Sequence, residues 1–281
     1  MRIDAHHHLW TLARGDYGWL TPKLAPIYRD FAVADLAPLL SAAEICGTIL
    51  VQAAPTEAET MFLLDITDGA ELVRGVVGWT DFDAEDAAAR IEAFAGRTHL
   101  VGLRPMVQDI ADDDWLLKPG LTAGLAAMAE QNLIFDALVL PRHLPRLSRV
   151  VDLHPDLQFV LDHCAKPSLA TGDIAAWKDD IAKLARRPNI VCKLSGLATE
   201  AAPGWQVADL RPAVDHILAS FGPERLLWGS DWPVVNLAGG YAKWLAAAET
   251  LLAELSDDER AGIFGLNAAR IYLSNRGRPA T

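Results

Sequence analysis

The sequence predicts a closed (β/α)8 barrel, an α/β TIM barrel, that forms a single domain over residues 1–281. Eight short β-rich runs alternate with alanine-rich stretches that suit helices. Several runs are apolar almost throughout, such as Thr-Ile-Leu-Val at 48–51, which is typical of strands buried on both faces of a parallel sheet. The length of 281 residues is also close to that of one such barrel.

The expected strands are ordered along the chain with helical stretches between them. The helix over 83–95 has an acidic first turn, and the others are rich in Ala and Leu. An open, doubly wound sheet is the alternative, but no Gly-x-Gly-x-x-Gly motif follows the first run. The strands are expected at 2–8, 47–53, 72–79, 99–105, 133–139, 157–163, 189–195 and 225–231, and helices at 83–95, 121–131, 174–186 and 210–221.

Composition excludes several classes of protein. Hydrophobic residues make up 51% of the chain, yet no apolar run approaches the roughly 20 residues needed to cross a bilayer. The N-terminus has no signal-peptide pattern, so a cytoplasmic location is expected. Three cysteines without Cys-x-x-Cys spacing indicate buried, reduced thiols rather than disulfides or a zinc-thiolate site.

The charge balance bears on possible partners. A net charge of −12 argues against nucleic acid, because phosphate binding needs a concentrated basic face. A small-molecule substrate is the expected partner, no membrane is involved, and a homo-oligomer stays open.

Residues 9–34 form a long first loop, which is typical of a lid or a binding element. The loop carries several aromatic side chains that either cover a ligand or pack on the rim of the barrel. These are Trp10, Tyr17, Trp19, Tyr28 and Phe31, with Arg29 among them.

The C-terminal ends of barrel strands meet at one mouth, so polar residues there are the candidates for function. The first strand ends in His6-His7-His8, and alternation places His6 and His8 on one face. Two imidazoles on one face can share a metal or polarise a carbonyl. We expect a structural role for His7, which points the other way.

Further candidates follow the middle strands. Arg104 is suited to a carboxylate or a hydroxyl-rich ligand, or forms an ion pair between strands. His163 is expected to face the first-strand histidines across the mouth. Lys166 binds a substrate carboxylate or pairs with Asp162. Lys193, inside an apolar strand, contacts substrate or neutralises an interior carboxylate.

Asp231 ends the eighth strand, which lies beside the first when the barrel closes. The carboxylate is therefore expected near His6 and His8. A carboxylate in that position can take a proton from water or complete a metal site.

Several segments together resemble the amidohydrolase superfamily, in particular its lactonase-rich "amidohydrolase 2" branch. They are Asp-Ala-His-His-His-Leu-Trp at 4–10, Gly-Leu-Arg at 102–104, Leu-Asp-His-Cys-Ala-Lys-Pro at 161–167, Lys-Leu-Ser-Gly-Leu at 193–197, Trp-Gly-Ser-Asp-Trp-Pro at 228–233 and Phe-Gly-Leu-Asn-Ala-Ala-Arg-Ile-Tyr at 264–272. The resemblance implies a hydrolase of sugar-acid lactones, such as L-fucono- or L-rhamnonolactone, with His6, His8, His163 and Asp231 at its centre.

The chain departs from the two-metal pattern of that superfamily. Arg104 stands where a metal-bridging Lys or Glu ends the fourth strand, and Asp136 replaces a His on the fifth. One divalent ion held by His6, His8, His163 and Asp231 is expected, with zinc suited to that set. Metal-free catalysis, in which the same histidines polarise the carbonyl, is the alternative.

In the expected reaction, Asp231 removes a proton from the attacking water, and the histidines or the ion hold the oxyanion. Arg104, Lys166, Arg29 and Trp232 are the predicted substrate-binding residues. The competing functions are a metal-dependent decarboxylase of an aromatic or unsaturated acid and a non-catalytic barrel that binds a sugar acid.

Overall fold

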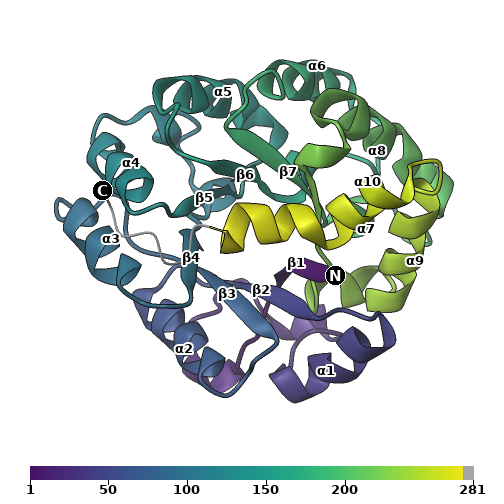
Figure 1. The fold of residues 1–281 in the computed structure, drawn as a ribbon, viewed down its shortest axis with the longest axis horizontal. Helices are drawn as coiled ribbons and strands as arrows, with labels where there is room; N and C mark the ends of the chain where they lie inside the picture. Colours follow the sequence, from purple (N-terminus) through teal and green to yellow (C-terminus); the bar gives the residue numbers. More distant parts are fainter. Residues whose placement is uncertain (275–281) are drawn as a thin grey trace.

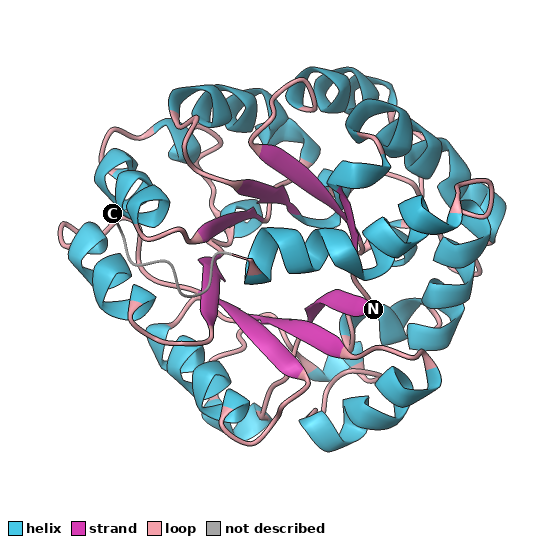
Figure 2. Ribbon diagram, viewed as in Figure 1, coloured by secondary structure: helices cyan, strands magenta, loops and turns pink. Residues whose placement is uncertain are grey.

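The computed structural model describes residues 1–274 and contains an eight-stranded parallel sheet with helices around it (Figures 1 and 2). The strands follow one another in chain order, and a parallel bridge between His7 and Trp232 joins the last strand to the first. The predicted (β/α)8 barrel is therefore confirmed. Residues 275–281 of the expected single domain lie outside the described part.

All eight predicted strands are present, each shorter than expected. The predicted ranges ran into the loops at the mouth, where the backbone leaves the extended region; Asp231, for example, has a φ of 56°. The strands are β1 Ile3–His7, β2 Gly47–Val51, β3 Val73–Gly78, β4 Leu100–Leu103, β5 Ile134–Ala137, β6 Phe159–Leu161, β7 Ile190–Leu194 and β8 Leu226–Trp228.

The helices form the outer ring of the barrel in Figure 1. The four helices expected from the sequence are α3, α4, α6 and α8. Helix α3 starts later than expected, and Asp83 lies in the loop before it, where it accepts hydrogen bonds from Trp115 and Lys118 of the loop between β4 and α4. The helices are α1 Val33–Ala42, α2 Glu57–Thr67, α3 Ala87–Ala95, α4 Leu121–Glu130, α5 Leu144–Leu153, α6 Ala175–Leu184, α7 Leu197–Glu200, α8 Val207–Phe221, α9 Tyr241–Leu251 and α10 Asp257–Ala261.

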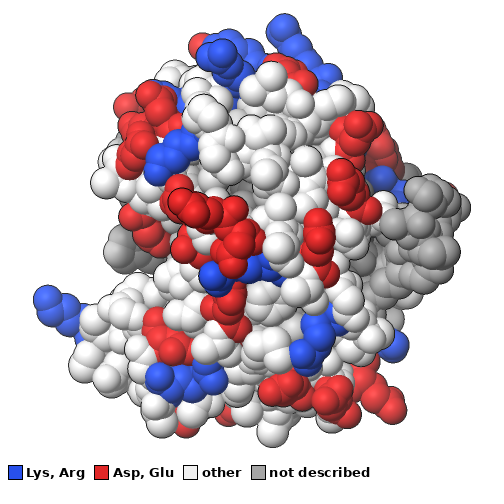
Figure 3. Space-filling model, turned by 90° about the vertical axis from the view of Figure 1, so that its left-hand side faces the viewer, with Lys and Arg blue, Asp and Glu red and all other residues white. Residues whose placement is uncertain are grey.

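No helix within residues 1–274 has the length and apolar character needed to cross a bilayer. On the face shown in Figure 3, acidic clusters alternate with separate basic groups.

A C-terminal helical segment crosses the barrel axis and closes the end opposite the mouth formed by the C-terminal ends of the strands (Figure 1). It comprises two π-type stretches, Gly262–Leu266 and Ala269–Leu273. Gly265 allows the close approach, since a Cβ there would lie 2.3 Å from the carbonyl oxygen of Met1. The segment packs on inward-facing strand residues, which form a core with Ala268, Ile271 and Tyr272; its strand members include Ile3, Ile49, Val77, Val101, Ile134, Val160, Val191 and Leu227.

Above this apolar layer the barrel interior contains buried charge. The hydroxyl of Tyr272 donates to Asp136, at 2.8 and 2.9 Å from its two carboxylate oxygens. Burial and the neighbouring Asp136 carboxylate raise the pKa of Tyr272 well above its usual value, so the phenol keeps its proton. Asp136 also accepts a hydrogen bond from the Lys193 ammonium, and neither side chain is exposed to solvent.

We predict that Tyr272→Phe lowers the free energy of unfolding by about 1–3 kcal/mol, because it leaves a buried carboxylate short of one donor. Urea unfolding, followed by circular dichroism, measures the change. Tyr28→Phe is the control, because Tyr28 is 39% exposed and should change stability by less than about 0.5 kcal/mol. Equal stability of the two variants would contradict a stabilising role for the Tyr272 hydroxyl.

Candidate active site

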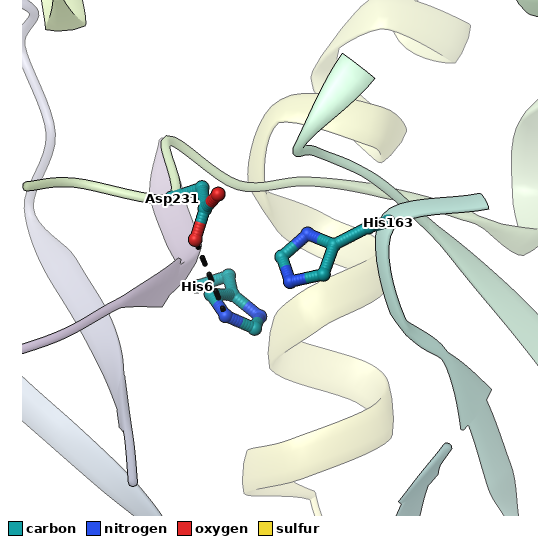
Figure 4. Close-up of side chains that lie close together, drawn as sticks. All are labelled: His6, His163 and Asp231. Atoms are coloured by element: carbon teal, nitrogen blue, oxygen red, sulfur yellow. Dashed lines mark ion pairs between the residues drawn. The ribbon is translucent and has the colours of Figure 1, made fainter. Parts of the chain in front are cut away.

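The structure brings together four side chains from three places in the sequence, and Figure 4 shows three of them, His6, His163 and Asp231. The Nε2 atom of His8 lies 3.2 Å from Nε2 of His6 and 3.3 Å from Oδ1 of Asp231. One ligand atom from each of His6, His163 and Asp231 lies within 4.8 Å of the other two. The candidate residues of β1, β6 and β8 therefore share one centre at the mouth of the barrel.

The buried charge of the barrel interior holds the ring of His6. Its Nδ1 lies 3.5 Å from Oδ1 of Asp162 and 3.3 Å from the Lys193 ammonium. Burial and the neighbouring Lys193 lower the pKa of His6 well below its usual value, so the imidazole is neutral. The Lys193 ammonium can only donate hydrogen bonds, and so can Arg104 Nη1, which lies 3.4 Å from His6 Nε2. The His6 ring is therefore held between these two donors and the Asp162 carboxylate.

Hydrogen bonds to Nδ1 orient the imidazoles of His8 and His163. Nδ1 of His8 donates to the carbonyl oxygen of Val51 at 2.8 Å, which turns Nε2 toward His6 and Asp231. Nδ1 of His163 is bonded to the Ser195 hydroxyl at 2.9 Å. Burial lowers the pKa of His163 to about 4, so this ring is also neutral near pH 7.

Unusual backbone geometry places two of these side chains. Residues 163–166 all have φ between 52° and 58°, and Asp231 has a φ of 56°. Side chains other than Gly rarely adopt this left-handed region, which occurs mainly where surrounding contacts enforce it. The Asp231 amide donates to the carbonyl oxygen of His6 at 2.8 Å and so fixes the carboxylate above β1.

Asp231 is a carboxylate among imidazoles. Burial raises its pKa, but the neighbouring His163 and His8, helped by Lys166, outweigh that effect, and the pKa lies below its usual value. Asp231 is therefore ionised at neutral pH. An ionised carboxylate next to a cavity is suited to accept a proton or to hold a cation.

These residues open onto a cavity of about 170 Å³. His8, His163 and Asp231 line it, together with Lys166 and Trp19 of the long first loop. The remaining wall comes from the loops after β2, β4, β5 and β8 and includes Ala53, Arg104, Met106, Gln108, Asp109, Leu138 and Val234.

Arg104 and Lys193 both neutralise interior carboxylates. Arg104 lines the cavity, yet its guanidinium lies 3.1 Å from Asp162 and bonds the backbone and side-chain oxygens of Gln52. Lys193 lies 3.0 Å from Asp162 and bonds Asp136 as well. From the sequence, each residue was expected either to contact substrate or to pair with an interior carboxylate. Lys193 pairs with carboxylates inside the barrel, whereas Arg104 both pairs with Asp162 and lines the cavity. Lys166 does not pair with Asp162.

Two predicted substrate-binding residues lie away from the cavity lining. Arg29 faces outward, where it forms an ion pair of 3.1 Å with Asp35 and stacks on the Phe31 ring. Trp232 is only 2% exposed and packs edge-on against Phe31, with ring centres 5.1 Å apart. Neither residue lines the cavity, because local partners hold both side chains, and their contact with substrate stays a prediction.

The long first loop packs on the rim for most of its length. Trp10, Tyr17 and Phe31 are buried there, whereas Trp19 reaches the cavity. His7 lies on the opposite side of β1, as expected, with Nε2 2.9 Å from the Thr48 hydroxyl.

The residues that position the site were not predicted from the sequence. Ser195 orients His163, and Gln52 holds Arg104, although both lie at strand ends where the barrel geometry pointed to function. Glu200, in α7, interacts with Lys166 and Asp231, and burial raises its pKa. No local sequence pattern singles out Glu200, since only the folded chain brings it to the mouth.

The donor set fits a divalent cation. The Nε2 atom of His8 faces Nε2 of His6 at 3.2 Å, and the Asp231 carboxylate lies beside both. Three imidazoles and one carboxylate around a small volume are ligands that a divalent metal accepts.

Comparisons with known proteins agree with this geometry. A family model described as Amidohydrolase matches residues 3–273. The chain is 45% identical to a protein of Burkholderia ambifaria named L-fucono-1,5-lactonase, over 98% of this chain and 96% of that protein. It is 37% identical to a protein of Burkholderia multivorans with the same name, over 97% and 96% of the two chains.

A crystal structure of an amidohydrolase from Burkholderia multivorans with bound zinc has the same fold, with a TM-score of 0.92 and 37% identity. The match covers 97% of this chain and 99% of that one. A family model that spans almost every described residue, together with relatives matched from end to end, means that the chain belongs to the amidohydrolase family.

Proposed function

We propose that the chain hydrolyses L-fucono-1,5-lactone or a closely related aldonolactone, with Asp231 as the general base. The reaction class, opening of a sugar-acid lactone, is that of relatives matched over 97–98% of the chain. The observation that carries the residue assignment is the ionised Asp231 carboxylate beside three imidazoles at one cavity.

The substrate is proposed to enter with its carbonyl toward His6, His8 and His163. A cavity of about 170 Å³ suits one small ring, and the polar groups on its wall suit hydroxyls. Lys166 is the one lysine of this lining, and its ammonium is proposed to donate to a ring hydroxyl or to the oxygen that develops negative charge.

Asp231 is proposed to take the proton of the attacking water. Its contacts with His6 and His8 both involve Oδ1, so Oδ2 is the oxygen proposed to accept this proton. Water adds to the carbonyl carbon, the bond from that carbon to the ring oxygen breaks, and protonated Asp231 returns the proton to the departing alkoxide. The product is an open-chain hydroxy acid, which loses a proton to solvent at neutral pH.

A zinc ion is proposed at His6, His8, His163 and Asp231, as the zinc-bound relative and the donor set support. Zinc bound there polarises the carbonyl as a Lewis acid. Metal-free catalysis, in which the same imidazoles polarise the carbonyl, is the alternative that removal of the metal tests. The cytoplasmic location and the homo-oligomer stay predictions.

We predict that Asp231→Asn lowers kcat/KM for L-fucono-1,5-lactone by at least about 10²–10⁴-fold, because the amide cannot accept the water's proton. Proton release in a weakly buffered assay measures the rate, and thermal unfolding tests the fold. Glu254→Gln, at an exposed site, is the control that keeps the rate. Near-wild-type turnover by folded Asp231→Asn would remove Asp231 from this role.

Removal of metal is expected to abolish lactone opening, and added zinc to restore it at about one equivalent per chain. Chelation followed by metal analysis and the same proton-release assay checks this over a panel of aldonolactones. Full activity in metal-free protein would support the alternative in which the imidazoles act alone. Release of CO2 from benzoate-type acids, with no lactone opened, would favour the decarboxylase instead.

Ser195→Ala is expected to lower zinc affinity about 10–100-fold, because His163 loses the hydroxyl that orients its ring. Competition with a fluorescent chelator measures the affinity. Ser168→Ala, at an exposed position, provides the matched control. Unchanged zinc affinity in Ser195→Ala would show that the hydroxyl does not position the ligand.

A further inference from the structure

A second, larger cavity adjoins the reaction cavity at the mouth of the barrel. Its volume is about 510 Å³, against about 170 Å³ for the cavity next to Asp231. Trp19, Met106 and Asp109 line both, so the two spaces are neighbours separated by few side chains. We call the larger one the side cavity; loops after β3 and β4 and part of the long first loop form its wall.

Aromatic side chains form much of this wall. Trp19, Trp79, Phe82 and Trp115 line the side cavity, and Trp79 is half-buried with part of its ring accessible. Phe82 and Trp115 are fixed, since both are only 3% exposed and the Trp115 indole donates to Asp83 at 2.7 Å. The negative faces of such rings attract the polarised C–H groups of a sugar ring and offer apolar contact area.

The charged part of the lining is entirely acidic. Asp16, Asp81, Asp83 and Asp109 line the side cavity, and no Lys or Arg does so among the described residues. Asp16 is paired with Arg14, and Asp83 with Lys118. Carboxylates accept hydrogen bonds from hydroxyls and repel anions, so the lining favours an uncharged, hydroxyl-rich ligand over an acid.

The volumes of the two cavities indicate how a ligand of the side cavity is connected to the substrate. The reaction cavity alone is below the roughly 300–1,000 Å³ of ordinary ligand sites, and the side cavity falls within that range. We propose that the side cavity binds an uncharged sugar ring joined to the lactone, so that glycosylated aldonolactones are substrates as well as free ones. This inference rests on the proposed function and extends its substrate class.

The test uses L-fucono-1,5-lactone and three derivatives that carry a β-D-galactosyl group on O2, O3 or O4. At least one derivative is expected to have a kcat/KM about tenfold above that of the free lactone, because the extra ring adds contacts that persist in the transition state. The three isomers cover the possible directions from the reaction cavity. Slower opening of all three than of the free lactone would overturn the proposal.

Two variants tie the preference to the side cavity. Gly18→Phe fills it, since a Cβ at Gly18 meets no atom within 4 Å, and Trp79→Ala removes an aromatic wall. Each is expected to lose the advantage of the favoured derivative and to leave opening of the free lactone within about twofold. Gly69→Phe, also open and away from the cavity, is the matched control. An equal effect of Gly18→Phe on both substrates would contradict the proposal.

A binding measurement separates failure of this inference from failure of the proposed function. Tryptophan emission is followed while methyl β-D-galactoside, and separately its uronate analogue, is added to the wild type and to Gly18→Phe. Saturable binding of the neutral sugar, weaker binding of the uronate and loss of both in Gly18→Phe would support the side cavity even if no lactone were opened. Absence of saturable binding would overturn the inference about the side cavity. If the galactoside binds but L-fucono-1,5-lactone is not opened, only the proposed function would be overturned.

Discussion

The ammonium of Lys193 is the charge around which the barrel interior is arranged. It is fully buried and lies between Asp136 of β5 and Asp162, which follows β6. With Arg104 beside Asp162, two cations face two buried carboxylates. Removal of one member would leave an uncompensated buried charge, which typically costs about 3–5 kcal/mol. These strands are therefore tied together by charge as well as by their hydrogen-bond ladder.

The same cluster connects the closed end of the barrel with its open mouth. Tyr272 of the C-terminal segment bonds Asp136, Asp136 bonds Lys193, and Lys193 stands beside His6. Burial raises the pKa of Asp162, but Lys193 and His6 outweigh this and keep the pKa well below its usual value, so the carboxylate stays charged. The position of the His6 imidazole thus depends on side chains that do not line the reaction cavity.

The sequence predicted the fold and the meeting of His6, His8, His163 and Asp231, because both follow from strand order and strand ends. Parallel strands in chain order bring their C-terminal ends to one mouth whatever the loops do. The partners of Arg104 could not be predicted in the same way, since the carboxylate that pairs with it, Asp162, lies far from it along the chain. No local pattern distinguishes an arginine aimed at substrate from one aimed at a buried neighbour.

Arg29 shows the same limit within a loop. Its charge and aromatic neighbours fitted a lid residue, but Asp35, six positions on, bonds the guanidinium at the surface. In contrast, the left-handed residues 163–166 and Asp231 carry no glycine that would have marked them in the sequence. Their conformations depend on contacts from other strands, such as the bond from the Asp231 amide to His6. The chemistry of the mouth therefore rests on backbone geometry that the assembled barrel imposes.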